Sequence, residues 1–329
     1  MLLLPNHDAC YLYLTIAVNC KVTTDPQAHR KRGLVMTQYC FKLTRLSSWL
    51  SLVAICMSAS LYADTSVWVA SSGGDMVYLG GTVHLLRPTD YPLPEEFEQA
   101  YQDSSEIYFE TDINSMTDLS VQAQMLQQLM YNDERTLQTV LNEEAYSALS
   151  RYTAATGLPM VMIEKFKPGM VVSTIQLLEF QKMGFTPQGV DAYFNTRALG
   201  DAKTLGELET VQQQIGFLAA MGEGYESEFI LMSLREMGEI ESMMEVMITA
   251  WRSGDTETLS ELFVADMQAQ SPELYDALLA GRNDKWLPQI EQMFRDRETE
   301  FVLVGAAHLV GERGLLNMLE SRGYEVRKL

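Results

Sequence analysis

Cysteine is missing from most of this 329-residue chain. All four cysteines lie before residue 64, namely Cys10, Cys20, Cys40 and Cys56. Residues 64–329 can therefore form no disulfide, and they contain no thiolate nucleophile and no thiolate metal site.

Histidine is nearly as scarce, with four in the whole chain. Two of them, His7 and His29, precede residue 64, so that only His84 and His308 remain beyond it. Any chemistry in residues 64–329 that uses an imidazole, as a base or as a metal ligand, must use one of these two side chains.

Positive charge is also in short supply, since 24 Lys and Arg stand against 44 Asp and Glu, a net charge of −20. Residues 1–63 hold six of the basic and two of the acidic side chains, so residues 64–329 keep 18 against 42, a net charge of −24. Such an acidic chain repels nucleic acid and anionic lipid surfaces. Nucleic acid is therefore excluded as a partner, and we expect a peptide or small-molecule substrate.

The one long apolar run lies near the N-terminus. Lys42 and Arg45 precede a stretch from Trp49 to Leu61, and Ala63 is a suitable cleavage residue, which is the layout of a secretory signal peptide. The run is shorter than the roughly 20 residues of a membrane-spanning helix. We expect cleavage, no stable membrane anchor afterwards, and a periplasmic or secreted protein. An uncleaved anchor helix is the alternative.

A signal peptide belongs at an N-terminus, and Met36 lies just before this one. Residues 1–35 show no coherent pattern. We interpret residues 1–35 as a spurious upstream extension, residues 36–63 as the signal peptide and residues 64–329 as a single domain.

Both ends of this domain predict strands. Alternating apolar residues and turn residues indicate a hairpin over 66–80, and similar signals mark the short elements that follow. The expected elements near the N-terminal end are a helix over Pro94–Gln102 and a strand over Glu106–Glu110. Those expected at the C-terminal end are a strand over Glu300–Val304, a tight turn over 305–308, a helix over Gly311–Arg322 and a strand over Tyr324–Lys328.

The stretch from about 114 to 298 shows helical spacing of Met, Leu, Gln and Glu. Short strands are expected at Leu158–Ile163 and Lys203–Leu208. The methionine-rich stretch Met232–Met247 is interpreted as helix core, with a methionine-lined binding groove as the alternative. The sequence therefore predicts an α/β (α+β) fold: strand–loop–helix units from the two ends form a central mixed sheet around a large helical insertion.

The two histidines share one local pattern. DMVYLGGTVHLL (75–86) and EFVLVGAAHLV (300–310) both read as an apolar strand, a glycine, two small residues and a histidine. The glycine allows a sharp turn. The histidine is then held at the carboxyl end of a strand, where open α/β sheets bind ligands. Two unrelated surface or core histidines are the alternative.

A carboxylate completes a common set of metal ligands, two histidines and one Asp or Glu. Glu110 is the leading candidate, because it ends the apolar strand that a short crossover places next to the His84 strand. We expect His84, Glu110 and His308 to hold a divalent ion such as Zn, Mn or Co. A strand-edge position without a metal is the alternative for Glu110.

Several segments resemble the TraB/GumN family, which is similar to the Tiki Wnt-inactivating proteases. They are YLGGTVHLLRPTDYPLPEEFEQAYQDSSEIYFETD, GVDAYFNTRALGDAKTLGELETVQQQ, LLAGRNDKWLPQIEQMF and FVLVGAAHLVGERGLLNMLESRGYEVRKL. The resemblance covers about Ser66 to Leu329. It implies an erythromycin-esterase/ChaN-like α/β fold with a helical insertion.

The resemblance also implies site residues. The family's metal or catalytic residues fall on His84, Glu110 and His308, its Arg-Asn pair falls on Arg282 and Asn283, and its L-E-T motif falls on Glu209. Arg282 is a catalytic candidate that stabilises an oxyanion or holds a substrate carboxylate; pairing with Glu209 to lock helices is the alternative. Asn283, Glu209 and Arg87 are candidates for substrate binding.

We therefore expect an exported, metal-dependent hydrolase, specifically a peptidase. Two alternatives stay open. One is a metal-free, esterase-like hydrolase in which a histidine is the general base for water, as the resemblance to erythromycin esterases implies. The other is a non-catalytic protein that binds a peptide or assists envelope assembly.

Overall fold

The computed structural model describes residues 65–295 and 297–329, and these belong to one compact unit. The predicted extension (1–35) and signal peptide (36–63) lie outside the described residues, so export stays a prediction. Within the described ranges, no helix is long and apolar enough to cross a membrane.

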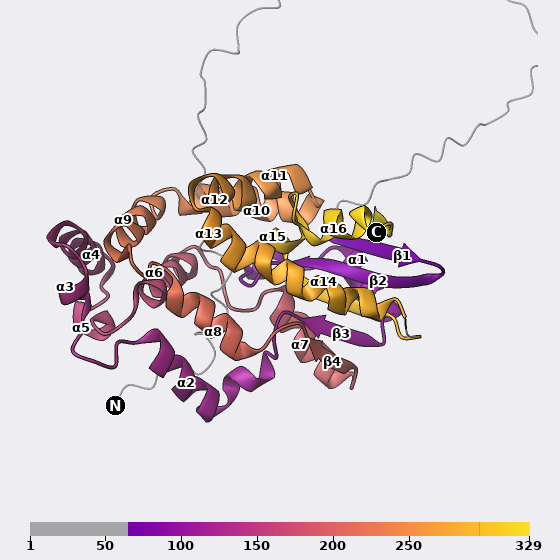
Figure 1. Ribbon diagram of the computed structural model, residues 1–329, viewed down its shortest axis with the longest axis horizontal. Helices are drawn as coiled ribbons and strands as arrows, with labels where there is room; N and C mark the ends of the chain where they lie inside the picture. Colours follow the sequence, from indigo (N-terminus) through magenta and orange to yellow (C-terminus); the bar gives the residue numbers. More distant parts are fainter. Residues whose placement is uncertain (1–64, 296) are drawn as a thin grey trace, which may run out of the picture. The chain divides into compact units, whose positions relative to one another are not determined.

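One mixed sheet forms the centre of the fold, as predicted (Figure 1). Its strands are β1 (Val67–Ser72), β2 (Asp75–Thr82), β3 (Glu106–Phe109), β4 (Thr204–Glu207), β5 (Glu300–Gly305) and β6 (Glu325–Lys328). They are arranged in the order β4-β3-β5-β2-β1-β6. Neighbours from β4 to β2 pair in parallel, whereas β1 is antiparallel to both of its neighbours.

This strand order corrects one expectation. The Glu110 strand is not next to the His84 strand, because β5 is inserted between β3 and β2 and pairs in parallel with both. The sheet is thus built by the two ends of the domain together. β5 comes from the C-terminal end and occupies the centre, where all six of its residues are buried.

Helices make up most of the rest of the described chain. The α-helices are α1 (Glu95–Asp103), α2 (Leu119–Leu129), α3 (Leu137–Val140), α4 (Glu143–Thr156), α5 (Met160–Ile163), α6 (Pro168–Lys182), α7 (Val190–Gly200), α8 (Val211–Ala220), α9 (Glu226–Glu236), α10 (Ile240–Ser253), α11 (Thr256–Ser260), α12 (Asp266–Gln270), α13 (Pro272–Tyr275), α14 (Gly281–Met293), α15 (Ala306–Leu309) and α16 (Leu315–Ser321). Short 3₁₀ turns are η1 (Pro88–Asp90) and η2 (Asn114–Thr117), and π-helical turns are η3 (Glu261–Ala265) and η4 (Asp276–Ala280).

Two local predictions were wrong. The strand expected over Leu158–Ile163 is the short helix α5, which starts after Pro159 and bonds the Met162 N–H back to the Pro159 carbonyl. A short apolar run does not distinguish helix from strand by periodicity. The tight turn expected over 305–308 is the one-turn helix α15, since Ala306 and Ala307 are good helix formers.

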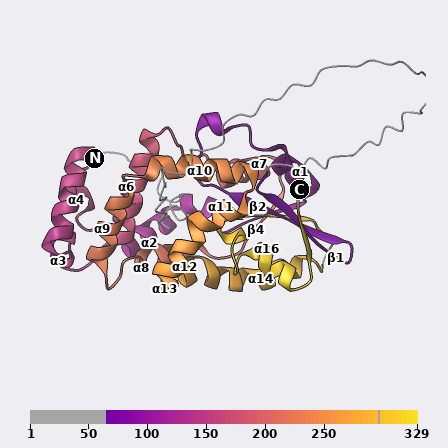
Figure 2. The same ribbon diagram turned by 90° about the horizontal axis from the view of Figure 1, so that it is seen from above.

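Helices cover both faces of the sheet. Figure 2 shows α1, α7 and α10 on one side and α14 and α16 on the other. On the first side, Phe97 of α1 stacks with Phe194 of α7 and contacts Trp251 of α10, and both phenylalanines contact Phe301 of β5. This aromatic cluster is buried and attaches the helical region to the central strand.

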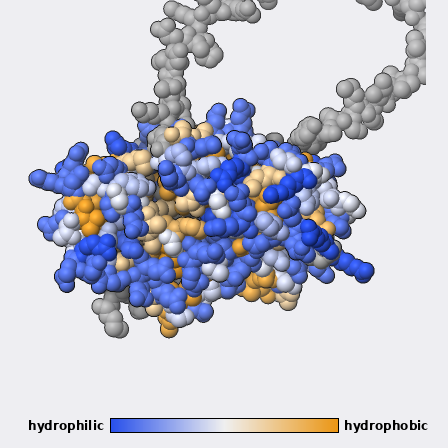
Figure 3. All heavy atoms as spheres, in the orientation of Figure 1, coloured by the Kyte–Doolittle hydropathy of each residue, from blue (hydrophilic) through white to orange (hydrophobic). Residues whose placement is uncertain are grey.

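The surface agrees with the composition. The face in Figure 3 is mainly hydrophilic, with smaller hydrophobic areas between the polar side chains. Such a surface is expected of a domain with a large excess of Asp and Glu.

Candidate active site

The two Gly-x-x-His motifs lie side by side. β2 and β5 are parallel neighbours in a register that pairs Gly81 with Val304 and Thr82 with Gly305. His84 and His308 therefore leave the sheet at the same carboxyl edge. Both histidine motifs follow parallel strands at their carboxyl ends, as the sequence predicts. The two histidines differ in their surroundings.

His84 forms a dyad with Asp191, which lies in the first turn of α7. The Nδ1–H of His84 donates to Oδ2 of Asp191 over 2.7 Å. Nε2 then carries the lone pair, and no residue in the described part of the chain hydrogen-bonds to it. The His84 side chain keeps 14% exposure and lines a cavity. A histidine oriented in this way by a carboxylate is suited to accept a proton.

The same contacts tune the basicity of His84. Burial lowers its pKa, but the charge and hydrogen bond of Asp191 act in the opposite direction, and the charge of Glu110 adds to them. The net effect raises the pKa of His84 above its usual 6.5. A raised pKa makes the neutral imidazole a stronger base.

Backbone contacts hold the His84 segment against the start of α7. The N–H of Val190 donates to the Val83 carbonyl over 3.0 Å, and Leu86 and Thr186 exchange two backbone hydrogen bonds. Gly189 makes this approach possible. A Cβ there would lie 2.2 Å from the His84 carbonyl carbon, closer than any side chain tolerates.

Replacing Gly189 with alanine should therefore separate His84 from Asp191. We expect a loss of about 1–3 kcal/mol in the free energy of unfolding, because the chain must shift to admit one methyl group. Urea denaturation measures the loss. Gly200→Ala at the end of α7 is the matched control, since Gly189 precedes the same helix and a Cβ at Gly200 meets nothing within 4 Å. Equal stability of the two variants would contradict the close approach.

His308 is buried and has both ring nitrogens engaged. Its Nδ1–H donates to Oδ1 of Asn283 over 2.7 Å, and its Nε2 accepts from Nη1 of Arg282 over 2.9 Å. The Asn283 amide also donates to the His308 carbonyl. Burial and the neighbouring guanidinium lower the pKa of His308 to about 3. His308 is thus a neutral hydrogen-bond acceptor at physiological pH.

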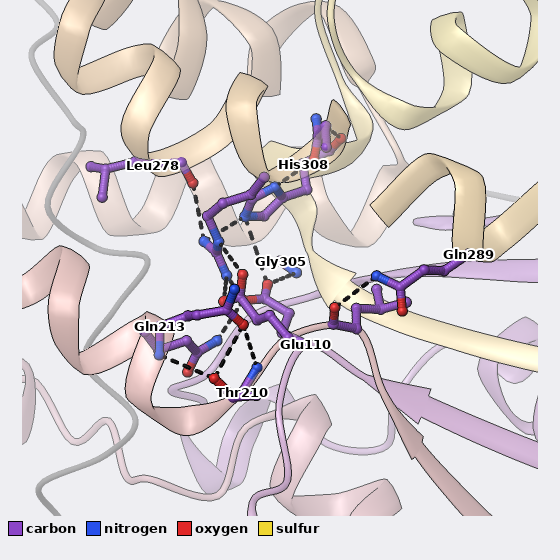
Figure 4. A network of polar contacts seen from close by, with 12 residues as sticks. Glu110, Thr210, Gln213, Leu278, Gln289, Gly305 and His308 are labelled. Carbon is purple, nitrogen blue, oxygen red and sulfur yellow. Dashed lines mark hydrogen bonds and ion pairs between the residues drawn. The ribbon is translucent and has the colours of Figure 1, made fainter. Parts of the chain in front are cut away.

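Arg282 has a buried acceptor for each of its five N–H bonds. Nε donates to Glu209, Nη1 donates to the Leu278 carbonyl and to His308, and Nη2 donates to Glu110 and Glu209. Three of these partners, Glu110, Leu278 and His308, are labelled in Figure 4. The guanidinium has no N–H left for a substrate oxyanion. Its geometry corresponds to the helix-locking alternative stated for Arg282 and Glu209.

Glu110 also uses both of its oxygens. Oε1 accepts from the Gly305 backbone N–H over 2.7 Å, and Oε2 accepts from Arg282 over 2.6 Å and from Gln214 over 3.1 Å. Burial is the largest single influence and raises the pKa of Glu110, but the charges of Arg282 and the two histidines and the Gly305 hydrogen bond together outweigh it, and the net shift is downward. For Glu209 burial outweighs the same guanidinium, and the pKa is raised.

These contacts decide how well the predicted metal ligands fit an ion. Arg282 occupies Nε2 of His308 and Oε2 of Glu110, the atoms that a shared ion needs. Across residues 65–295 and 297–329, no three His, Cys, Asp or Glu side chains form a group that could hold a metal. The donor set does not fit a divalent ion in this arrangement, and the predicted metal stays a prediction.

Arg87 makes contacts with other residues. Its guanidinium pairs with Asp90 and with Glu245 of α10 and stacks on the Phe185 ring. It is not among the residues that line the cavity beside His84. Arg87 thus connects the loop after His84 to α10, and its role in substrate binding stays a prediction.

Three residues at the site were missed by the sequence analysis. Asp191 lies in the GVDAYF segment. Its position in the first turn of a helix was the one sequence feature that could have pointed to it. Thr82 precedes His84 by two residues, lines the cavity and is 3% exposed, with no hydrogen-bond partner for its hydroxyl among the described residues. Glu236 lines the same cavity at the end of α9.

The comparisons with known proteins agree with the resemblance seen in the sequence. No curated protein and no solved structure matches the chain. The model of the TraB/PrgY/gumN family matches residues 66–328, which span the sheet, both histidine motifs and the whole of the candidate site. The chain therefore belongs to the TraB/PrgY/gumN family.

Proposed function

We propose that this protein is a hydrolase of peptide bonds in which His84 is the general base. One observation carries the proposal: the His84–Asp191 dyad lies at the wall of a cavity, with Nε2 of His84 free to take a proton. The dyad follows a parallel strand at its carboxyl end, where α/β sheets bind their ligands. The proposal combines the peptide substrate expected from the sequence with the metal-free histidine base of the stated alternative.

The reaction balances with water as the nucleophile. Nε2 of His84 accepts one proton from water while the water oxygen bonds to the carbonyl carbon of the substrate. The carbon–nitrogen bond then breaks, and the imidazolium returns the proton to the leaving amine. Asp191 is a positioning residue, because it holds the tautomer with Nδ1–H and stabilises the imidazolium charge.

Thr82 is the side chain suited to polarise the substrate carbonyl. Its hydroxyl is buried at the cavity, two residues before His84, and lacks a hydrogen-bond partner among the described residues. A hydroxyl in a dry site stabilises a developing oxyanion by hydrogen bonding.

Arg282 and its partners hold together the chain segments next to this site. The guanidinium links Glu110 after β3, Glu209 before α8 and His308 after β5. Because Glu110 also binds the Gly305 backbone, the cluster fixes the carboxyl edge of the central strand. The charges of Glu110 and Arg282 act on the pKa of His84 in opposite directions.

Thr82→Val should separate function from stability. Valine has nearly the shape of threonine and suits a strand, and removing a buried hydroxyl without a partner should not lower the free energy of unfolding. Loss of one oxyanion donor should reduce kcat by about 100- to 1,000-fold. The measurement is cleavage of a peptide library together with urea denaturation. Unchanged kcat would remove Thr82 from the mechanism.

Metal dependence can be tested on the purified protein by removing metal and measuring cleavage. We expect cleavage of the peptide library to persist after dialysis against a chelator, with substoichiometric metal by elemental analysis. A His84→Ala/His308→Ala double variant serves as the comparison. One bound ion per chain, lost in the double variant together with cleavage, would support the metal-dependent hydrolase instead. A stable protein that cleaves no peptide in either state would favour the non-catalytic binding alternative.

A further inference from the structure

Methionines line part of the cavity that His84 also lines. There are four, Met237 after α9 and Met243, Met244 and Met247 of α10. The empty volume is about 750 Å³, the space at its mouth included. Met244 and Met247 are buried in the hydrophobic core and Met237 packs against it, as the helix-core interpretation predicts. The same side chains also line the cavity, as the alternative interpretation states. Methionine is unbranched and polarisable, so such a wall adapts to apolar side chains of different shape.

One acidic group interrupts this apolar surface. Glu236 lines the cavity, and its Oε1 atom is buried with no hydrogen-bond partner among the described residues. Burial raises the pKa of Glu236 to about 7, although the charge of Arg235 acts against the shift. A buried carboxyl group without a partner is costly. A ligand that brings a donor to Oε1 would remove this cost.

The charge of the cavity favours a cationic donor. Among the described residues that line it there is no Lys and no Arg, and Glu236 is the only carboxylate. A cation placed against Glu236 favours the ionised carboxylate, and a hydrogen bond between two charged groups is stronger than one between neutral groups. The preferred occupant therefore carries a primary ammonium group next to an apolar side chain.

We propose that the cavity binds the amino-terminal residue of a peptide, with its apolar side chain against the methionines and its α-ammonium group donating to Glu236. An amino terminus carries these two groups on one carbon, whereas a lysine ammonium is separated from the backbone by its own flexible chain. The inference rests on the proposed peptide hydrolysis at His84. It makes the enzyme an aminopeptidase with a preference for apolar first residues.

The test compares matched peptides. Hexapeptides that begin with leucine are prepared with a free amino terminus, with an acetylated amino terminus, and acetylated with a lysine at the second position. Binding is measured by calorimetry to the full chain carrying His84→Gln, so that no substrate is consumed. We expect the free peptide to bind about 10- to 100-fold more tightly than either acetylated peptide.

A second substitution assigns this preference to Glu236. Glu236→Gln keeps the size of the side chain and removes its charge, so the preference for the free amino terminus should disappear. Glu241→Gln is the matched control, because Glu241 is exposed on α10 and does not line the cavity. The control should keep the full preference.

The outcomes distinguish this inference from the proposed function. Equal binding of free and acetylated peptides, or a preference that survives Glu236→Gln, would overturn the amino-terminal pocket even if the wild-type enzyme cleaves peptides. Tight binding of the acetylated lysine peptide would overturn it as well. A third outcome is a preference for the free amino terminus that depends on Glu236, in a protein that cleaves no peptide. This outcome would support the amino-terminal pocket and refute the proposed hydrolase activity.

Discussion

His84→Gln should lower kcat/KM for peptide cleavage by about 100- to 10,000-fold, the usual contribution of a general base. Glutamine can still donate to Asp191, so the contact with α7 survives, but the amide has no basic nitrogen. The loss should appear in kcat. Peptide-library cleavage measured beside urea denaturation separates this chemical effect from unfolding.

His308→Gln is the informative comparison. His308 has both ring nitrogens engaged and a pKa near 3, so it cannot act as a base at neutral pH. His308→Gln should lower the free energy of unfolding. It should leave the pH dependence of cleavage unchanged. If instead His308→Gln abolished the pH dependence of cleavage and His84→Gln kept it, the assignment of the base would be wrong.

The pH profile follows from the same shift. The pKa of His84 is raised above 6.5, and the base must be neutral to act, so cleavage should increase as pH rises through a pKa above 6.5. Asp191→Asn removes the charge that raises this pKa. The increase should then move to lower pH while kcat falls. NMR titration of the His84 ring checks the pKa without a substrate.

The main features of the sheet could be predicted from the sequence at the two ends of the domain. Apolar strands, a glycine and a histidine recur at 75–86 and 300–310, and the two strands do pair in parallel, with the motifs offset by one residue so that Thr82 lies beside Gly305. The predicted position of β3 beside β2 was wrong. The crossover from β2 to β3 is long enough to reach either the adjacent strand position or the next one. Sequence spacing does not say that a strand from the far end of the chain is inserted between them.

The polar partners were harder to predict. Asp191 lies 107 residues from His84, and only the packing of α7 on the sheet brings them together. Arg282, Glu110 and Glu209 come from three distant segments, and their residue types alone suit a metal site, an oxyanion site or an ion-pair cluster. The geometry distinguishes these, because five N–H donors meet five acceptors around one guanidinium.

Arg282→Met should be the most destabilising of the substitutions considered. It leaves Glu110 and Glu209 buried without their cation, which costs about 3–5 kcal/mol of unfolding free energy when one partner of a buried pair is removed. Both carboxylates are at most 6% exposed, so water cannot replace the guanidinium. Urea denaturation at pH 7 measures the loss. Arg313→Met is the matched control, since Arg313 pairs with Asp276 and Asp284 at the surface and should contribute about 0–1 kcal/mol.

Further variants and pH identify the cause of this loss. Adding Glu110→Gln and Glu209→Gln to Arg282→Met should recover stability, because no buried charge is then unpaired. In the wild type the folded pKa of Glu110 lies below its unfolded value of 4.5, so its contribution is present above pH 4.5 and is lost as pH falls through the folded pKa. Arg282→Met removes the main cause of that lowering. The difference in stability between wild type and variant should therefore shrink in acid; a difference that stays constant from pH 7 to pH 3 would mean that Arg282 contributes by packing rather than by charge.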